Sequence, residues 1–205
     1  MLTLYHAPQS RSVIARWMLE EVGEAYEVRP LSFKKGENRQ ASYLAINPMG
    51  KVPTLDHDGV VVTEAAAICG YLADAFPKAG LAPPLGDRRR GPYLKWLFFG
   101  PGALEPAVID RLLKREAGPK AMLGYGEFDA MLEIVAQAVA TGPYLLGESF
   151  SAADVVIGSG LHWGMMAKAV PERPEIARYA QRLGERPARK RVFEKDAALM
   201  KKMEG

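Results

Sequence analysis

Two serine hydroxyls near the start of the chain are candidates for binding an anion. Tyr5 ends the alternating stretch 2–5, which predicts a buried strand, and Ser10 and Ser12 stand where a helix is expected to begin. A hydroxyl at a helix N-terminus adds the helix dipole to its own hydrogen bond. One hydrogen bond to a charged group contributes about 1.5–3 kcal/mol, which lowers the pKa of a contacted thiol by roughly one to two units. Ser10 is the first candidate for this chemistry, Ser12 is a further candidate within the same helix start, and helix capping is a compatible second role of Ser10.

The stretch 47–55, Asn-Pro-Met-Gly-Lys-Val-Pro-Thr-Leu, is the second segment with chemical potential. Its prolines and glycine exclude a helix, whereas Val52, Thr54 and Leu55 favour a strand. Pro53 stands at the expected strand entrance, where a cis peptide bond would turn the N–H and C=O of Val52 outward. Such a backbone pair can bind an extended peptide as an added strand. An ordinary strand that begins at a proline is the alternative.

A βαβ unit is expected to position these groups. A strand over 2–5 precedes a helix that starts at Ser10 or Ser12 as N-cap and ends at Gly23, and a second strand follows over 26–29. A charged loop and a short helix over 41–46 then lead into the central stretch.

The residues after the central stretch predict a hairpin and a third helix. Asp58 and Gly59 form the turn, and residues 60–62 form the second strand of the hairpin. The helix opens with Thr63 as its N-cap and Glu64 in its first turn.

Helical patterns dominate the rest of the chain. Prolines and glycines over 77–86 mark a linker between an α/β domain at 1–76 and an all-helical domain at 87–205. Asp87 is expected to cap the first helix, which residues 100–102 must kink or end. Ser151 and Asp154 form a capping box at the start of a later helix. Further helices are expected over 105–115, 122–140, 174–184 and 188–195.

Composition and charge restrict the function classes. A net charge of +3 over 205 residues favours small anionic ligands and is far from the charge of a nucleic-acid-binding protein. The single cysteine, Cys69, excludes a disulfide framework and is expected to be a buried, inert thiol in a reducing compartment. The three histidines have no metal-ligand spacing. The arginine runs 88–90 and 186–191 are expected to be solvated faces.

No apolar run of the chain approaches the roughly 18 residues of a membrane span. The N-terminus lacks a basic region followed by an apolar one. We therefore expect neither a membrane span nor a signal peptide, and a cytoplasmic location.

Three segments in this order, NPMGKVPTL, then DG, then VVVTEAAAI, resemble the glutathione-binding half of a glutathione S-transferase. The loop Ala7-Pro8-Gln9-Ser10 resembles the active-site loop of bacterial, cytosolic-type transferases that use serine, and the capping box resembles a motif of the family's helical domain. The resemblance runs from Leu2 to about Lys195 and implies a thioredoxin-like α/β domain followed by an all-α domain. Two departures are Arg11, where beta-class members carry cysteine, and Ala65, where most members carry serine.

The resemblance implies a role for each part of the site. Ser10, with Tyr5 and Ser12 as alternatives, would hold the glutathione thiolate, and Val52 would pair with the cysteinyl backbone across a cis Pro53. The resemblance places the other glutathione contacts at Glu64 and Ala65 for the γ-glutamyl group and at Lys51, Lys35 and Arg39 for the glycyl carboxylate. Ring candidates for an electrophile pocket are Tyr93, Trp96 and Phe99.

The implied function is conjugation of glutathione, as co-substrate and without a metal, to a small hydrophobic electrophile in detoxification. Peroxide reduction, isomerisation or dehalogenation on the same site is an alternative, and so is a non-catalytic ligand-binding or interaction protein. The resemblance further implies a homodimer, with no nucleic-acid or membrane partner.

Overall fold

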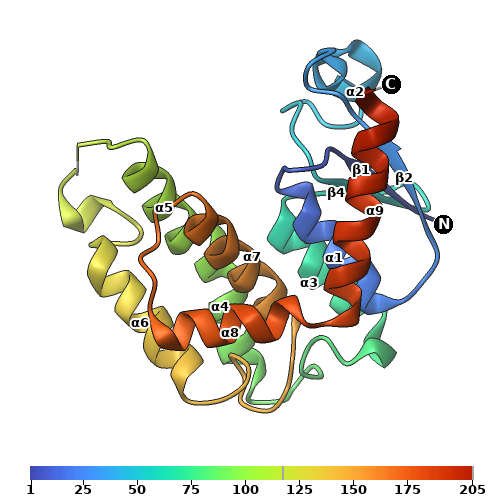
Figure 1. Ribbon diagram of the computed structural model, residues 1–205. Coiled ribbons are helices and arrows are strands. Elements are labelled where there is room, and N and C mark those ends of the chain that lie inside the picture. The colour runs from blue at the N-terminus through green and yellow to red at the C-terminus, as the bar shows by residue number, and fades with distance from the viewer. Residues whose placement is uncertain (117, 205) are drawn as a thin grey trace. The chain divides into compact units, whose positions relative to one another are not determined.

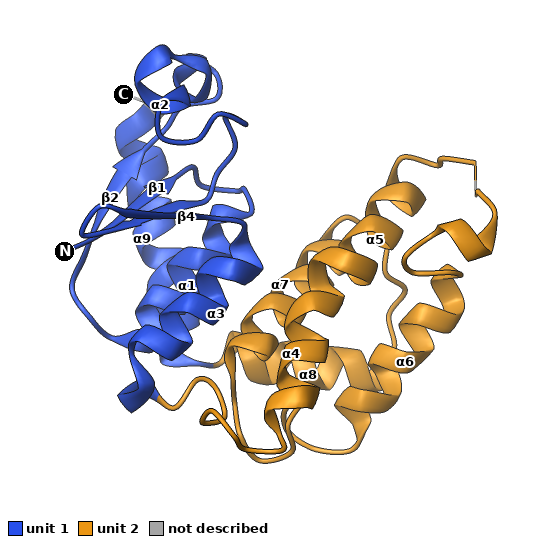
Figure 2. Ribbon diagram, turned by 180° about the vertical axis from the view of Figure 1, so that it is seen from behind, with its two compact units in different colours: residues 1–79, 186–205 blue, residues 80–185 orange. Residues whose placement is uncertain are grey.

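A four-stranded mixed sheet with the strand order β2-β1-β3-β4 is the centre of the first structural unit. β1 (Leu2–His6) pairs in parallel with β2 (Tyr26–Pro30) and antiparallel with β3 (Thr54–His57), and β3 forms a hairpin with β4 (Val60–Thr63). The computed structural model describes residues 1–116 and 118–204. It separates into two compact units, residues 1–79 with 186–205 and residues 80–185 (Figures 1 and 2).

Helices of the first unit form where the sequence places apolar residues at helical spacing. α1 (Ser12–Val22) buries Ala15, Met18 and Leu19 and ends at Gly23, as predicted. It packs against α3 (Ala65–Ala75) and against α9 (Pro187–Glu204), the last helix of the chain. The remaining pieces are short: η1 (Glu37–Arg39), α2 (Ala41–Leu44) and η2 (Pro77–Ala79).

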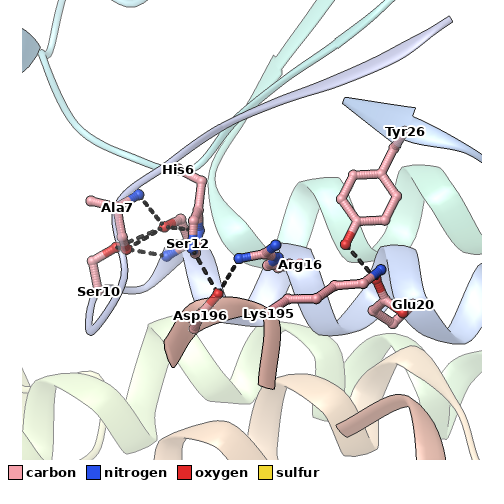
Figure 3. Close-up of polar contacts among 9 residues, drawn as sticks. All are labelled: His6, Ala7, Ser10, Ser12, Arg16, Glu20, Tyr26, Lys195 and Asp196. Atoms are coloured by element: carbon pink, nitrogen blue, oxygen red, sulfur yellow. Dashed lines mark hydrogen bonds and ion pairs between the residues drawn. The ribbon is translucent and has the colours of Figure 1, made fainter. Parts of the chain in front are cut away.

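The position of α9 differs from the prediction, which assigned it to the helical domain. Contacts place it in the first unit, where ion pairs join it to α1. Glu20 accepts hydrogen bonds from Arg191 (Nε–Oε2 2.8 Å) and from Lys195, and Glu21 accepts two from Arg186, at 2.6 and 2.7 Å (Figure 3 shows Lys195 beside Glu20). The prediction of a solvated face is therefore wrong for Arg186 and Arg191, which bind Glu21 and Glu20 of α1, and for Arg189, which is buried.

These ion pairs predict acid sensitivity of the first unit. Burial raises the pKa of Glu20, but hydrogen bonds from Lys195, Tyr26 and Arg191 outweigh it and hold the pKa below its ordinary value. A carboxyl group with a depressed folded-state pKa stabilises the fold above its unfolded pKa, and this contribution is lost as the pH falls from about 4 through the lower folded-state value. Urea midpoints measured between neutral pH and about pH 3 should fall over that window.

A matched pair of variants isolates the contribution of Glu20. Glu20→Gln should lower the midpoint at neutral pH and flatten its decrease in acid, whereas Glu24→Gln, at an exposed position, should change neither. An unaltered pH dependence in Glu20→Gln would contradict the assignment.

The second unit is helical throughout its regular structure. α4 (Arg90–Phe99) continues through a π-helical turn η3 (Gly100–Leu104) into α5 (Glu105–Leu112), so the predicted irregularity at 100–102 is confirmed. A Cβ at Gly100 would lie 2.4 Å from Cγ1 of Val156, and the residue therefore permits the close approach of this turn to α7. The other helices are η4 (Lys120–Met122), α6 (Phe128–Ala140), α7 (Ala152–Met166) and α8 (Pro174–Gly184).

Three predicted helix boundaries in this unit are wrong. α6 begins at Phe128, not at residue 122, because a turn closes at Gly126, whose φ is 66°. α5 ends at Leu112 instead of residue 115. Asp87 lies before α4, and its carboxylate accepts the Arg89 N–H at 2.8 Å, so it caps the preceding turn.

The predicted capping box at the start of α7 is confirmed. The Asp154 carboxylate accepts hydrogen bonds from the Ser151 N–H (2.9 Å) and hydroxyl (3.0 Å), and its other oxygen accepts from the Leu145 N–H and the Tyr179 hydroxyl, both at 2.9 Å. Burial raises the pKa of Asp154, against hydrogen bonds that lower it. In residues 1–116 and 118–204, no helix has the length and apolar character of a membrane span.

Candidate functional site

Ser10 lies in the loop between β1 and α1. Its Oγ is 2.7 Å from the Ala7 carbonyl oxygen and 2.7 Å from the Ser12 Oγ, and it accepts the Ser12 N–H at 3.2 Å. The N-cap residue of α1 is Arg11, so the prediction that Ser10 or Ser12 is the N-cap is wrong. The Ser10 hydroxyl nevertheless satisfies a donor of the first turn, and its side chain is only half-buried.

Ser12 is fully buried and connects this loop to deeper polar groups. Its Oγ accepts the Ala7 N–H at 3.0 Å and lies 2.8 Å from Nδ1 of His6. Nε2 of His6 lies 3.1 Å from the carboxylate of Asp196 in α9, and Arg16 in α1 binds the same carboxylate oxygen (Figure 3). Both the imidazole and the carboxylate are buried.

Sequence reasoning missed His6 and Asp196. His6 was assigned to a loop, yet it ends β1 on the same face as Leu2 and Leu4, and all three are buried. The alternation of residues 2, 4 and 6 was a usable signal for its burial. Asp196 had no such signal, because its partner lies 190 positions earlier in the chain.

Tyr5 occupies the opposite face of the sheet from His6, since neighbouring residues of a strand alternate between faces. Its ring centroid is 5.5 Å from that of Tyr43 in α2. The Tyr43 hydroxyl lies 2.9 Å from Oγ1 of Thr54, and burial raises the Tyr43 pKa. The Tyr5 side chain therefore belongs to the packing between the sheet and α2 and lies on the face away from His6.

The loop before β3 is held by hydrogen bonds to its carbonyl groups. The Lys51 carbonyl oxygen accepts from the Tyr43 hydroxyl at 2.5 Å and from the Asn47 amide at 2.8 Å. Gly50 has a φ of 62°, and a Cβ there would lie 2.7 Å from the Asn38 carbonyl oxygen, so only glycine fits.

The Val52–Pro53 peptide bond that follows is cis. Within the described residues, the Val52 N–H and C=O make no backbone hydrogen bond. The side chains of the three candidate cations of this region are all exposed: Lys35, Arg39 and Lys51.

Glu64 is the N-cap residue of α3, which corrects the predicted N-cap at Thr63. Thr63 remains in β4, paired with Thr54, and the chain turns into the helix only at the next residue. Glu64 has φ 67° and ψ 121°, a sparsely populated conformation for a residue with a side chain, with a strain on the order of 1–3 kcal/mol. Its carboxylate is exposed, and Ala65 opens the helix with an N–H that has no intrahelical acceptor.

The three ring candidates of the electrophile pocket lie in the second unit. Tyr93 and Trp96 are 1% and 5% exposed and belong to the core in which α4 packs against α7. Phe99 is half-buried, with its ring centroid 5.2 Å from that of Trp96. Of the three, Phe99 has the most accessible ring.

Cys69 is fully buried in α3, as predicted, and burial raises the pKa of its thiol well above the usual range. Residues 1–116 and 118–204 contain no group of three His, Cys, Asp or Glu side chains placed to hold a metal ion.

The three segments that carry candidate site residues emerge from one end of the sheet. Tyr5 at the end of β1 pairs with Thr54 at the start of β3, and Thr54 pairs with Thr63 at the end of β4. The loop that holds Ser10, the loop that ends at Val52 and the residue Glu64 continue directly from these three positions.

Comparisons with known proteins identify the family of this chain. A family model described as the N-terminal domain of glutathione S-transferase matches residues 1–74. The glutathione S-transferase GstA of Escherichia coli O157:H7 is 28% identical over 189 residues, which cover 91% of this chain and 94% of the relative. The disulfide-bond oxidoreductase YfcG of Escherichia coli strain K12 is 28% identical over 201 residues and 92% of each chain.

Solved structures share the whole fold. A glutathione transferase from Methylococcus capsulatus strain Bath is 30% identical with a TM-score of 0.81, covering 97% of this chain and all of that one (100%). A glutathione transferase homolog from Sulfitobacter with bound glutathione is 28% identical with a TM-score of 0.78, covering 95% and 98% of the two chains. The first unit is thus a thioredoxin-like domain, accompanied by a helical region. The chain belongs to the glutathione S-transferase family, and the predicted resemblance and fold class are confirmed.

Proposed function

We propose that this chain is a glutathione transferase in which Ser10 stabilises the glutathione thiolate for attack on a small hydrophobic electrophile. The observation that carries the proposal is the common origin of the three segments at one end of the sheet, set by the pairs of Thr54 with Tyr5 and with Thr63. A hydroxyl at the start of a helix, the Val52 backbone pair, which makes no backbone hydrogen bond within the described residues, and a second helix N-terminus thereby lie at the same end of the sheet.

Each group of glutathione has a suitable partner in the proposed site. The Val52 N–H and C=O pair with the cysteinyl backbone as an added strand would. The exposed Glu64 carboxylate binds the γ-glutamyl ammonium, while the Ala65 N–H and the N-terminus of α3 bind the α-carboxylate. Lys51, with Lys35 or Arg39, binds the glycyl carboxylate.

Ser10 fits the thiolate better than the alternative hydroxyls do. Ser12 is fully buried, and four polar atoms already surround its Oγ. Tyr5 lies on the sheet face covered by α2 and contacts the Tyr43 ring. The Ser10 side chain is half-buried, so its hydroxyl has both a fixed position and access to a ligand.

Glutathione binding can be tested by titration calorimetry with a matched variant. We expect one glutathione site per chain, and Glu64→Gln should weaken binding about tenfold, because it removes the charge of a hydrogen bond worth about 1.5–3 kcal/mol. Glu24→Gln is the control, as an exposed carboxylate outside the site. No heat of binding up to roughly tens of millimolar glutathione would reject the proposal. The binding free energy would then be weaker than the roughly −4 kcal/mol that corresponds to a millimolar Kd.

Glutathione-dependent disulfide reduction is a second candidate, favoured by the similarity to YfcG. Arg11 stands beside Ser10 where a thiol-transferring beta-class site would carry cysteine, and this departure favours conjugation. The two reactions separate when a chloronitrobenzene and a small organic disulfide are compared as substrates in the presence of glutathione. Binding without turnover of either would instead support a ligand-binding or interaction protein.

We further propose that the protein is a homodimer, as the family resemblance implies. Exposed apolar side chains occur in the helical unit on α4, where Leu94 and Phe98 are 39% and 62% exposed. Light scattering at micromolar concentration should give about twice the chain mass of 22.4 kDa. A mass of one chain at that concentration would contradict the dimer.

A further inference from the structure

The polar groups behind Ser10 form a continuous hydrogen-bonded path into the core of the first unit. Ser10 Oγ is 2.7 Å from Ser12 Oγ, Ser12 Oγ is 2.8 Å from His6 Nδ1, and His6 Nε2 is 3.1 Å from Asp196 Oδ1 (Figure 3). We propose that this path carries the proton of the glutathione thiol to His6, which holds it as an imidazolium. The inference rests on the proposed function, because the thiol must be bound at Ser10.

The charge state of Asp196 defines which His6 nitrogen carries a proton. Burial raises the Asp196 pKa, but the interactions with His6 and Arg16 outweigh it and hold the pKa below its ordinary value. An ionised carboxylate only accepts hydrogen bonds, so His6 Nε2 must donate. In the neutral imidazole Nδ1 is then a bare acceptor, and the Ser12 hydroxyl is the group that can donate to it.

With neutral His6, the Ser10 proton points into the protein. Ser10 has one hydroxyl proton and two acceptors in reach, the Ala7 carbonyl oxygen and the Ser12 Oγ, each at 2.7 Å. The Ala7 carbonyl oxygen also lies 3.0 Å from the Ser12 Oγ and competes with His6 Nδ1 for the Ser12 proton. In either arrangement the Ser10 Oγ presents a lone pair to the ligand side, and a thiol S–H can donate to it.

The transfer shifts one proton along three hydrogen bonds: from the thiol to Ser10, from Ser10 to Ser12, and from Ser12 to His6. The thiol S–H bond breaks and a Ser10 O–H bond forms, the former Ser10 proton passes to Ser12, and the former Ser12 proton binds His6 Nδ1. Each hydroxyl regains one proton, and no electrons are exchanged. The hydrogen bonds from the thiol to Ser10, from Ser10 to Ser12 and from Ser12 to His6 are then reversed, while His6 Nε2 still donates to Asp196, so that Ser10 donates to the thiolate that has formed. The path thus supplies the stabilising bond in the same step that ionises the thiol.

Charges around His6 determine when it can hold the proton. Asp196 from α9 stabilises the imidazolium, whereas Arg16 from α1 opposes it, and the neighbouring position in β2 is the uncharged Pro30. Arg189 of α9, whose pKa burial lowers to about 10, interacts with Asp196 and adds to the opposing charge. The thiolate forms as the imidazolium forms, so the transfer leaves the net charge of the site unchanged. The proposed transfer therefore adds a proton to His6 Nδ1 in the same step that forms the thiolate.

Nitrogen NMR of the histidine rings tests this coupling in the intact protein. The chain contains three histidines, and His6→Asn identifies the signals of His6 by their loss. Saturation of the wild-type protein with glutathione near neutral pH should convert the His6 Nδ1 signal from the bare to the protonated type. S-methylglutathione, which has no thiol proton, should bind and leave the signal in the bare form. His57, whose Nδ1 contacts the Tyr71 hydroxyl at 2.8 Å, is the internal control and should not change.

Thiolate absorbance in the ultraviolet, recorded on the same samples, separates the possible failures. Thiolate formation with a bare His6 Nδ1 would overturn the relay and leave the proposed function standing. The same change of His6 with both ligands would also overturn it, since a binding-induced shift needs no thiol proton. Glutathione binding without thiolate would overturn both the relay and the proposed activation by Ser10.

A variant of Asp196 tests whether its charge stabilises the imidazolium of His6. Asp196→Asn keeps a hydrogen-bonding side chain but removes the charge that stabilises the imidazolium. It should raise the apparent pKa of the bound thiol by about one unit and leave the affinity for S-methylglutathione unchanged. His57→Asn should alter neither quantity. Equal thiol pKa values in Asp196→Asn and wild type would contradict a role for the buried pair.

Discussion

Ser10→Ala is expected to reduce the rate of glutathione conjugation about ten- to a hundredfold near pH 6.5, where a free thiol is almost entirely protonated. The variant removes the hydrogen bond that we propose stabilises the thiolate, so the pKa of the bound thiol should rise by about one to two units. The affinity for glutathione should hardly change, because in the proposed complex Val52, Glu64 and the cationic side chains bind the rest of the tripeptide. Raising the pH should recover much of the rate, since hydroxide then ionises the thiol.

The matched control is Tyr5→Phe, which keeps the ring that packs near Tyr43. Its rate should stay close to wild type over the whole pH range. If Tyr5→Phe shows the pH-dependent loss and Ser10→Ala does not, the hydroxyl role belongs to Tyr5. If neither variant shows it, Ser12→Ala is the next measurement, and stabilisation of the thiolate by the helix dipole alone becomes the remaining mechanism.

Asp154→Ala is expected to destabilise the protein by roughly 3–5 kcal/mol, which is among the largest effects of single substitutions. The buried carboxylate accepts hydrogen bonds from the Ser151 N–H and hydroxyl, the Leu145 N–H and the Tyr179 hydroxyl. Its removal leaves these donors buried without an acceptor, at a cost of about 1–3 kcal/mol for each unsatisfied group, partly relieved by relaxation. Urea unfolding at neutral pH measures the change.

Two milder variants of the same cluster calibrate this result. Ser151→Ala removes one side-chain donor at the N-cap and should cost about 1 kcal/mol. Tyr179→Phe removes a single hydrogen bond and should fall between the two, because its ring remains in the core. A loss below about 1 kcal/mol in Asp154→Ala would show that the cluster is not a determinant of stability.

Local sequence chemistry determined much of this fold. Gly23 ends α1, the hairpin turns at residues 58 and 59, and the capping box at Ser151 begins α7, because each signal acts over a few neighbouring residues. The same is true of the irregular turn at Gly100. The segments that carry the candidate site were identified by their resemblance to a family motif, and each of these motifs is likewise contiguous in the chain.

Tertiary structure decided the features that depend on distant partners. Thr63 has the chemistry of an N-cap, but pairing with Thr54 keeps it in β4 and moves the start of α3. The sequence predicts a solvated face for the arginines at 186–191. Only the packing of α9 against α1 brings Arg191 to Glu20 and Arg186 to Glu21.

His6 and Asp196 show most clearly what a local pattern cannot predict. They are separated by 190 positions, and no sequence pattern near either residue indicates their hydrogen bond. A local pattern can indicate that a side chain is buried. It does not contain the identity of the group that meets that side chain in the core.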